Sequence, residues 1–221
     1  MGIDAQSITM FLAETWATIY MTLISAVISY AIGIPLGVIL VVTDKDGIAP
    51  NKMIHSILGV IINIFRSIPF LILLVMVLPI TKILVGTTLG ARAVIPPLIF
   101  ASAPYIGRMV ESSLKEVPGG VIEAAKSMGA SNWQIIYKVL IPEARPSLYV
   151  GAAISITTIL SYSAMAGFVG GNGLGAIALN YGYYRYQYDI MIVAVVILVV
   201  LVQIIQESWM GLSRKTDKRV R

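Results

Sequence analysis

Five long apolar runs dominate this sequence and restrict what the chain can fold into. Each is close to the roughly 20 residues that a helix needs to cross a bilayer. Only 12% of the residues are charged, about half of the ~25% usual in soluble domains. We therefore predict an all-α integral membrane protein with five transmembrane helices, at about residues 16–42, 54–80, 93–110, 148–169 and 190–209.

Several of these spans contain residues that disturb a regular lipid-facing helix. The stretch Gly33-Ile34-Pro35-Leu36-Gly37 in the first span predicts a kink, and its two glycines four residues apart predict close helix packing. Arg66 in the second span has two interpretations. Either its side chain reaches a lipid phosphate near the end of the helix, or it lines a pathway or caps a broken helix. Three prolines predict a bent third span, and the Ser, Thr, Ala and Gly residues of 148–169 predict a central position.

The segments around the spans are short. Residues 1–14 are too polar to span and predict an interfacial helix that ends near Glu14. No Lys or Arg precedes the first apolar run, so we do not expect a cleaved signal peptide. The glycine-rich segment 170–175 does not match GxGxxG and lacks a surrounding βαβ pattern, which predicts a flexible turn. The tyrosines of 181–188 are typical of an aromatic belt at the membrane surface, and 211–221 is a basic tail.

The polar stretch 111–146 lies between two spans and predicts a pair of short helices. A Pro-Gly-Gly turn at 118–120 precedes the first helix, and Gly129 is placed to end it in the left-handed conformation. Ser131 and Gln134 have the spacing of a capping box that begins the second helix. We expect that helix to end near Ile141-Pro142, because proline disfavours the helical conformation for the residue before it.

Each of these short helices has one apolar face, for which the sequence leaves two interpretations. The helices either lie on the membrane surface or dock into a groove on another protein. The apolar positions are Val121, Ile122, Ala125 and Met128 in the first helix, and Trp133, Ile136, Tyr137 and Leu140 in the second.

The residues of this stretch also resemble a known motif. Glu123-Ala124-Ala125, then Gly129 six residues after the glutamate, then Ile141-Pro142, resemble the EAA loop of bacterial ABC importer permeases. The resemblance implies the type I ABC importer permease fold, with this loop in the cytoplasm, inserted into a cleft of an ATP-binding subunit. It makes Glu123, Ala124, Ala125, Gly129, Ile141 and Pro142 the candidate residues for coupling to the ATPase.

Three further stretches resemble the methionine importer permeases in particular: 63–70, 103–111 and 162–167. This resemblance implies a multi-pass protein of the bacterial cytoplasmic membrane that works as a homodimer. It also implies two ATPase subunits, an external substrate-binding protein and transport of L- and D-methionine by alternating access, without any contact with nucleic acid. The implied domain is 15–210, with the coupling loop at about 111–146.

The distribution of basic residues predicts the orientation, since cytoplasmic loops carry an excess of Lys and Arg. Five spans place the two termini on opposite sides. Twelve of the sixteen basic residues fall on the side of the polar stretch 111–146, against three on the other side. We therefore expect the N-terminus outside and the C-terminus in the cytoplasm. The twelve are Lys45, Lys52, Arg108, Lys115, Lys126, Lys138, Arg145, Arg214, Lys215, Lys218, Arg219 and Arg221, and the three are Lys82, Arg92 and Arg185.

The residues give no indication of catalysis by this chain. It has no cysteine, and its one histidine, His55, argues against a Cys/His metal site. No acid pair and no activated nucleophile stands out, so we expect neither an active site nor a bound metal. The chain also lacks GxxxxGK[ST], so we expect ATP and Mg²⁺ to be bound by a partner ATPase and no cofactor in this chain.

Five residues are candidates for the transport pathway: Asn63, Arg66, Tyr162, Ser163 and Met165. For two of them a structural role fits equally well. Met165 could fill a gap between packed helices, and the hydroxyl of Ser163 could bind the backbone of the preceding helical turn. Two alternative functions stay open. One is an ABC permease for another amino acid or small solute, and the other is a passive channel or membrane scaffold.

Overall fold

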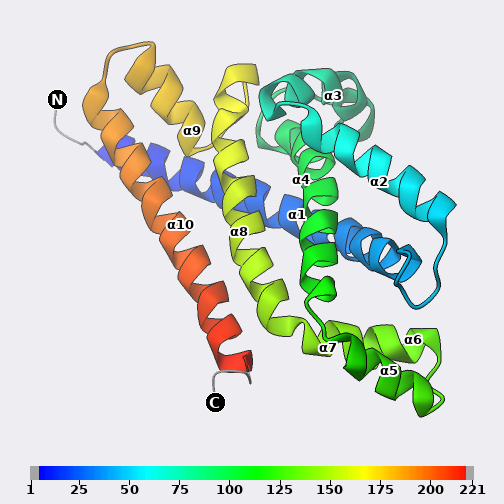
Figure 1. Cartoon of the computed structure of the whole chain (residues 1–221). Coiled ribbons are helices and arrows are strands. Elements are labelled where there is room, and N and C mark those ends of the chain that lie inside the picture. Colours follow the sequence, from blue (N-terminus) through cyan, green and yellow to red (C-terminus); the bar gives the residue numbers. More distant parts are fainter. Residues whose placement is uncertain (1–4, 218–221) are drawn as a thin grey trace.

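The computed structural model describes residues 5–217, and this part of the chain is helical with short connections and no strand (Figure 1). The long helices are α1 (Ala5–Thr43), α2 (Lys52–Ser67), α3 (Phe70–Val85), α4 (Ala91–Lys115), α8 (Arg145–Ser163) and α10 (Tyr188–Thr216). The short ones are α5 (Gly119–Ser127), α6 (Asn132–Ile135), the π-helix η1 (Ile136–Leu140), α7 (Ile141–Glu143), the 3₁₀-helix η2 (Ala164–Val169), α9 (Leu174–Ile177) and the π-helix η3 (Ala178–Tyr183).

The five predicted spans are present. Within residues 5–217, four helices are long and apolar enough to cross a membrane, namely α1, α4, α8 with η2, and α10. The fifth span is the pair α2 and α3, which are bent by 107° relative to each other. The bend lies at Ile68-Pro69, where the extended backbone of Ile68 ends α2 because proline disfavours a helical residue before it. Arg66 therefore lies in the last turn of α2, just before the break between α2 and α3.

The first helix differs from its prediction at the N-terminal end. Residues 5–14 do not form a separate interfacial helix, because α1 continues through Glu14 without a break to Thr43. At 39 residues this helix is about 58 Å long, much longer than the ~30 Å hydrocarbon core. It passes behind α4 and α8 and runs across both of them at a large angle (Figure 1).

Burial differs sharply between the spans. In α4, 56% of the most apolar window is buried inside the protein, against 44% in α8 with η2 and 6% in α10. The bundle is therefore centred on α4, with α8 beside it. Helix α10 lies at the edge, where one side packs on the bundle through Val193, Ala194 and Ile197 and the other side is exposed. One hydrophobic core extends from the spans into the short helices that follow α4, and it includes Leu98, Ile106, Leu114, Ala125, Ile135 and Leu140.

The loops assigned to one side of the membrane do gather at one end of the bundle. Lys115 at the end of α4 forms an ion pair with Asp44, which follows α1. Ser213 near the end of α10 donates a hydrogen bond to the carbonyl of Pro146 at the start of α8. The side of the membrane on which this end lies stays a prediction from charge. Of the basic residues behind that prediction, Lys218, Arg219 and Arg221 lie outside the described residues, and residues 211–216 of the predicted tail continue α10.

Candidate functional site

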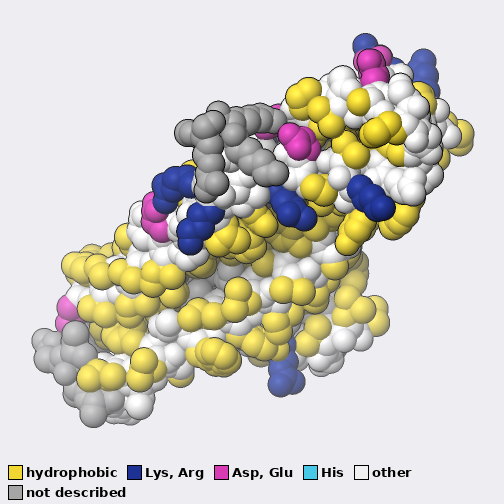
Figure 2. Space-filling view, turned by 90° about the horizontal axis from the view of Figure 1, so that it is seen from below, with side chains coloured by type: hydrophobic (Ala, Val, Ile, Leu, Met, Phe, Trp, Pro, Cys, Tyr) yellow, Lys and Arg dark blue, Asp and Glu magenta, His cyan; other side chains and the backbone are white. Residues whose placement is uncertain are grey.

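The two-helix segment, residues 119–143, projects from the end of the bundle between α4 and α8 (Figure 1). Its predicted apolar faces are divided between the core and the surface. Of the predicted positions, Ala125 and Leu140 are buried, and so is Ile135, which the prediction did not include. The residues that keep large apolar surfaces exposed are Val121, Met128, Trp133 and Tyr137, with exposed fractions of 41%, 81%, 73% and 67%. Figure 2 views the molecule from this end and shows hydrophobic side chains lying between charged ones on the projecting part.

The chain reverses between the two short helices as the sequence predicts. Gly129 has φ +79°, and the amide of Ala130 donates to the carbonyl of Ala125 across the turn. The capping box is also confirmed. Gln134 N donates to Ser131 Oγ at 3.3 Å, and Ser131 N donates to Gln134 Oε1 at 2.8 Å. Local hydrogen bonds therefore define the angle between α5 and α6.

Gly129→Val should disturb this turn through the backbone alone, because a Cβ at this position meets no atom within 4 Å. A left-handed conformation costs an L-residue about 1–2 kcal/mol, and more for a β-branched side chain. We expect the variant to insert into membranes normally. It should lose most of the ATP-dependent transport that the resemblance to ABC importer permeases implies. Gly119→Val is a matched control, since its position is equally open and its φ is not positive. Equal function of both variants would contradict this prediction.

The second helix ends at Glu143, next to the predicted Ile141-Pro142, but the proline does not end it in the way expected. Ile141 keeps helical angles of φ −64° and ψ −47° in front of the proline. The reason is the π-helix η1, in which the amide of Ile141 donates to the carbonyl of Ile136, five residues earlier. The wider turn accommodates a proline that lacks an amide donor. Pro142 therefore lies in the helical turn that follows η1 and does not break it.

The candidate coupling residues differ in their accessibility. Glu123, Ala124 and Gly129 are exposed, whereas Ala125 is buried and Ile141 and Pro142 are half-buried. The carboxylate of Glu123 has no hydrogen bond or ion pair with any described residue. Glu123 and Ala124 are thus available to another molecule, while Ala125 anchors α5 to the core.

The candidate pathway residues fall into two groups. Tyr162, Ser163 and Met165 lie where α8 changes into η2, and the ring of Tyr162 stacks on Phe70 of α3 at 4.4 Å between centroids. Ser163 is buried and donates to the carbonyl of Leu160 at 2.7 Å, the backbone bond that the sequence left open as an alternative. Met165 is 38% exposed.

The second group lies on α2 and consists of Asn63 and Arg66, both exposed. Asn63 Oδ1 accepts a hydrogen bond from Arg108 of α4 at 3.1 Å. Arg66 makes no hydrogen bond or ion pair within the described part of the chain. The structure therefore connects Asn63 to the bundle centre and leaves the guanidinium of Arg66 accessible.

Sequence reasoning missed a polar network around Glu111, which is only 6% exposed. Arg108 Nη1 pairs with Glu111 Oε2 at 2.6 Å, and Lys115 Nζ lies 2.9 Å from Glu111 Oε1 and 2.7 Å from Asp44 Oδ2. The hydrogen bond from Lys115 holds the pKa of the Asp44 carboxyl below its usual value. We call these residues, with Asn63, the Glu111 network. The signal in the sequence is the i,i+3 and i,i+4 spacing of opposite charges on one helix.

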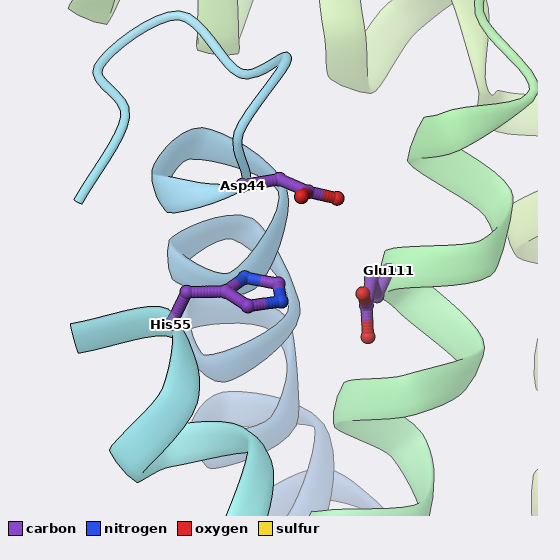
Figure 3. Close-up of side chains that lie close together, drawn as sticks. All are labelled: Asp44, His55 and Glu111. Carbon is purple, nitrogen blue, oxygen red and sulfur yellow. The ribbon is translucent and has the colours of Figure 1, made fainter. Parts of the chain in front are cut away.

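His55 lies beside two members of this network (Figure 3). Its Nδ1 lies 3.0 Å from the carbonyl of Leu40, and since a carbonyl only accepts, Nδ1 carries the proton. Three potential ligand atoms lie within 4.8 Å of one another, one each from Asp44, His55 and Glu111. This spacing would suit a metal ion. However, the ammonium of Lys115 already contacts both carboxylates. We therefore interpret the cluster as an ion-pair network.

The glycine-rich segment at the other end of the bundle is held by α1, contrary to the prediction of a flexible turn. Glu14 accepts hydrogen bonds from the amide of Gly173 and from Asn172 Nδ2. Thr18 Oγ1 accepts from the amide of Leu174 at 2.9 Å. Two side chains of α1 therefore anchor the segment between η2 and α9. Their partners lie more than 150 residues away, so no local pattern indicates this role for Glu14.

A five-span helical bundle with an exposed two-helix segment defines a membrane-embedded transporter component. The chain belongs to the family of binding-protein-dependent transport system inner membrane components, whose family model matches residues 33–215. The predicted all-α fold with five spans and the resemblance to ABC importer permeases are thereby confirmed.

Relatives resemble the chain over between two thirds and nearly all of its length. A probable D-methionine transport system permease protein of Vibrio cholerae is 50% identical over 210 residues, which cover 95% of this chain and 93% of the relative. Its counterpart in Haemophilus influenzae is 42% identical over 93% of this chain and 96% of the relative. The D-methionine transport system permease protein of Escherichia coli K12 is 48% identical over 69% of this chain and 70% of the relative.

Solved structures agree with this assignment. A chain of the MetNI methionine ABC transporter, in an inward-facing conformation, superposes with a TM-score of 0.95 at 43% identity and covers 97% of this chain and 100% of its own length. An amino acid ABC transporter crystallised with histidines reaches a TM-score of 0.77 at 19% identity, with the same coverage, and shows the fold alone.

Proposed function

We propose that this chain is the membrane-spanning permease of an ATP-driven importer of L- and D-methionine. The observation that carries the proposal is the similarity over whole chains, at 43% identity and a TM-score of 0.95, to a subunit of a methionine ABC transporter. The name of the Vibrio cholerae relative supports the same substrate. The importer lies in the bacterial cytoplasmic membrane, with the N-terminus of the permease outside and its C-terminus in the cytoplasm.

The chain contributes the pathway, and its partners contribute energy and capture. Two copies of the chain assemble with two ATPase subunits, which bind ATP and Mg²⁺ and perform the hydrolysis. A substrate-binding protein delivers the solute from outside. In this division of labour the chain itself is not catalytic and holds no cofactor.

The two-helix segment is the contact with the ATPase. Its Met128, Trp133 and Tyr137 expose large apolar side chains, and the carboxylate of Glu123 has no partner in the described residues. Aromatic residues of this kind anchor protein interfaces. Because the buried side of the segment belongs to the same core as α4, movement of the segment is transmitted to the spans. ATP binding and release by the ATPases then alternate the side on which the pathway is open.

The pathway residues are a second part of the proposal. Asn63 and Arg66 on α2, together with Tyr162, Ser163 and Met165 around the end of α8, line the route of the solute. A guanidinium without a partner suits the carboxylate of an amino acid, and a thioether suits the side chain of methionine. The break between α2 and α3 supports the assignment, since broken spans occur where a helix lines a cavity.

The test is uptake of labelled L-methionine and D-methionine into proteoliposomes that contain this chain and its ATPase, with the binding protein outside and ATP inside. We expect accumulation that requires ATP, the ATPase and the binding protein, and that stops with a non-hydrolysable ATP analogue. ATP-driven uptake of another amino acid instead of methionine would refute the substrate. Solute flux without any dependence on ATP or the ATPase would favour a passive channel.

A further inference from the structure

The Glu111 network joins three parts of the bundle directly above the two-helix segment. Arg108, Glu111 and Lys115 occupy the last two turns of α4, only a few residues before α5 begins. Their partners lie on the connection after α1 and on α2. The two-helix segment is joined to the bundle at the end of α4 and at the start of α8, and the network lies at the first of these two connections.

Arg108 forms the bridge from α4 to α2. Its Nη1 binds Glu111, while its Nη2 donates to the carbonyl of Gly59 at 3.3 Å and to Asn63 Oδ1 at 3.1 Å. The guanidinium lies close against α2, since a methyl group at Gly59 would approach Nη2 to 3.4 Å. A planar guanidinium suits this position because its donors point in several directions at once, which a lysine ammonium on a flexible stem does not reproduce.

From α2 the connection continues to the candidate pathway. The pair α2 and α3 meets at the 107° bend, and α3 begins at Phe70. The ring of Phe70 lies parallel to that of Tyr162, with an interplanar angle of 5°. A shift of α2 therefore carries the first residue of α3 against the end of α8, where Ser163 and Met165 lie.

We propose that Arg108 is the positioning residue that makes α2 and α3 move with α4, so that movement of the two-helix segment changes the pathway. This inference rests on the proposed function, because it requires an ATPase that displaces the segment. Arg108 acts through Asn63 and Gly59 and does not contact the solute. Its partner Glu111 is kept in place on the other side by Lys115.

The experiment measures ATP hydrolysis and methionine uptake in the same proteoliposomes, and so gives the ATP consumed per methionine imported. For Arg108→Met we expect hydrolysis within about twofold of wild type and uptake reduced about tenfold or more, within the usual range of coupling between sites. The uptake of Arg108→Lys should lie between those of the wild type and of Arg108→Met. Arg214→Met is the matched control, because the Arg214–Glu207 pair is exposed on both sides and belongs to α10.

A double-mutant cycle tests the hydrogen bond between Arg108 and Asn63 directly. It complements the replacement of the whole Arg108 side chain by methionine. Asn63→Ala removes one acceptor of Arg108 and leaves the pair with Glu111, so it should raise the ATP used per methionine in the same direction. Because Asn63 is also a candidate pathway residue, the cycle is measured at saturating methionine, where weaker solute binding alone does not lower uptake. If both residues act through their mutual hydrogen bond, the double variant loses no more uptake than Arg108→Met alone. Multiplied losses would show that the residues act separately and would overturn the proposal.

Two other outcomes are decisive. Hydrolysis and uptake that fall by the same factor in Arg108→Met, together with a lower yield of assembled transporter, would reduce Arg108 to a purely structural role and overturn the proposal. Wild-type proteoliposomes without ATP-dependent uptake would overturn the proposed function, and with it this inference. A wild-type transporter that works and a proportional loss in the variant would refute only the role of Arg108.

Discussion

The double replacement Trp133→Ala and Tyr137→Ala should leave the chain folded in the membrane and prevent it from holding its ATPase. Both side chains are about two-thirds or more exposed, so their loss removes little internal packing and should change stability by no more than about 0.5 kcal/mol. At an interface the same residues are large, rigid anchors, and truncation of such an anchor costs about 2 kcal/mol or more. This corresponds to roughly 30-fold weaker binding for each residue.

Co-purification of the permease with its ATPase measures this effect directly, with thermal unfolding of the permease alone as the check on its fold. Tyr184→Ala is the matched control, because Tyr184 is 58% exposed but lies beside η3, outside the two-helix segment. We expect this control to retain the ATPase at wild-type yield and to import methionine normally. A double variant that still retains its ATPase would show that the exposed apolar surface of the segment is not the docking surface.

Local patterns were sufficient to predict much of the two-helix segment. The left-handed Gly129 and the capping box of Ser131 and Gln134 depend on residues within six positions of one another, and both are present. The end of the second helix was predicted within a residue, but the expected non-helical conformation of Ile141 was wrong, because the rule for Pro142 assumes a regular α-helix. The π-helix before it widens the turn, and this choice depends on packing of the whole segment that no short window of sequence contains.

The number of spans followed from hydropathy, but their shape did not. The apolar run 54–80 contains enough residues for one helix, and only Pro69 signals the break that divides it into α2 and α3. The bend of 107° depends on what each half packs against, including the stack of Phe70 on Tyr162. Hydropathy therefore predicts that a segment enters the membrane and leaves its path inside the bundle open.

Polar residues at the ends of spans were the hardest to interpret. Glu14 was read as the end of an interfacial helix and Arg108 only as one basic residue of the polar side, yet Glu14 holds the glycine-rich connection and Arg108 binds α2. Their partners are 158 and 45 residues away in sequence, so hydrogen bonding of this kind depends on the tertiary arrangement. The candidate site is thus predictable where it is a local motif, and unpredictable where distant helices assemble it.

Close packing of α1 on α4 leads to the second large expected effect. The pair Gly33 and Gly37 predicted such packing, and the structure shows it. A Cβ at Gly37 would lie 2.6 Å from the carbonyl oxygen of Gly107 and from Val110 Cβ. The oxygen belongs to the backbone of α4, so a change of side-chain rotamer cannot relieve the contact and the two helices must separate.

Gly37→Leu should therefore destabilise the permease by about 3 kcal/mol, the upper end of the usual cost of overpacking. For a chain of this size that cost lowers the melting temperature by roughly 6–12 °C. Gly211→Leu is the control, because the same side chain on α10 meets nothing within 4 Å of its Cβ. Thermal unfolding in detergent, followed by tryptophan fluorescence, compares the two variants. If Gly37→Leu melts at the wild-type temperature, α1 does not pack on α4 as closely as the structure shows, and the α1 side of the Glu111 network would then need a different explanation.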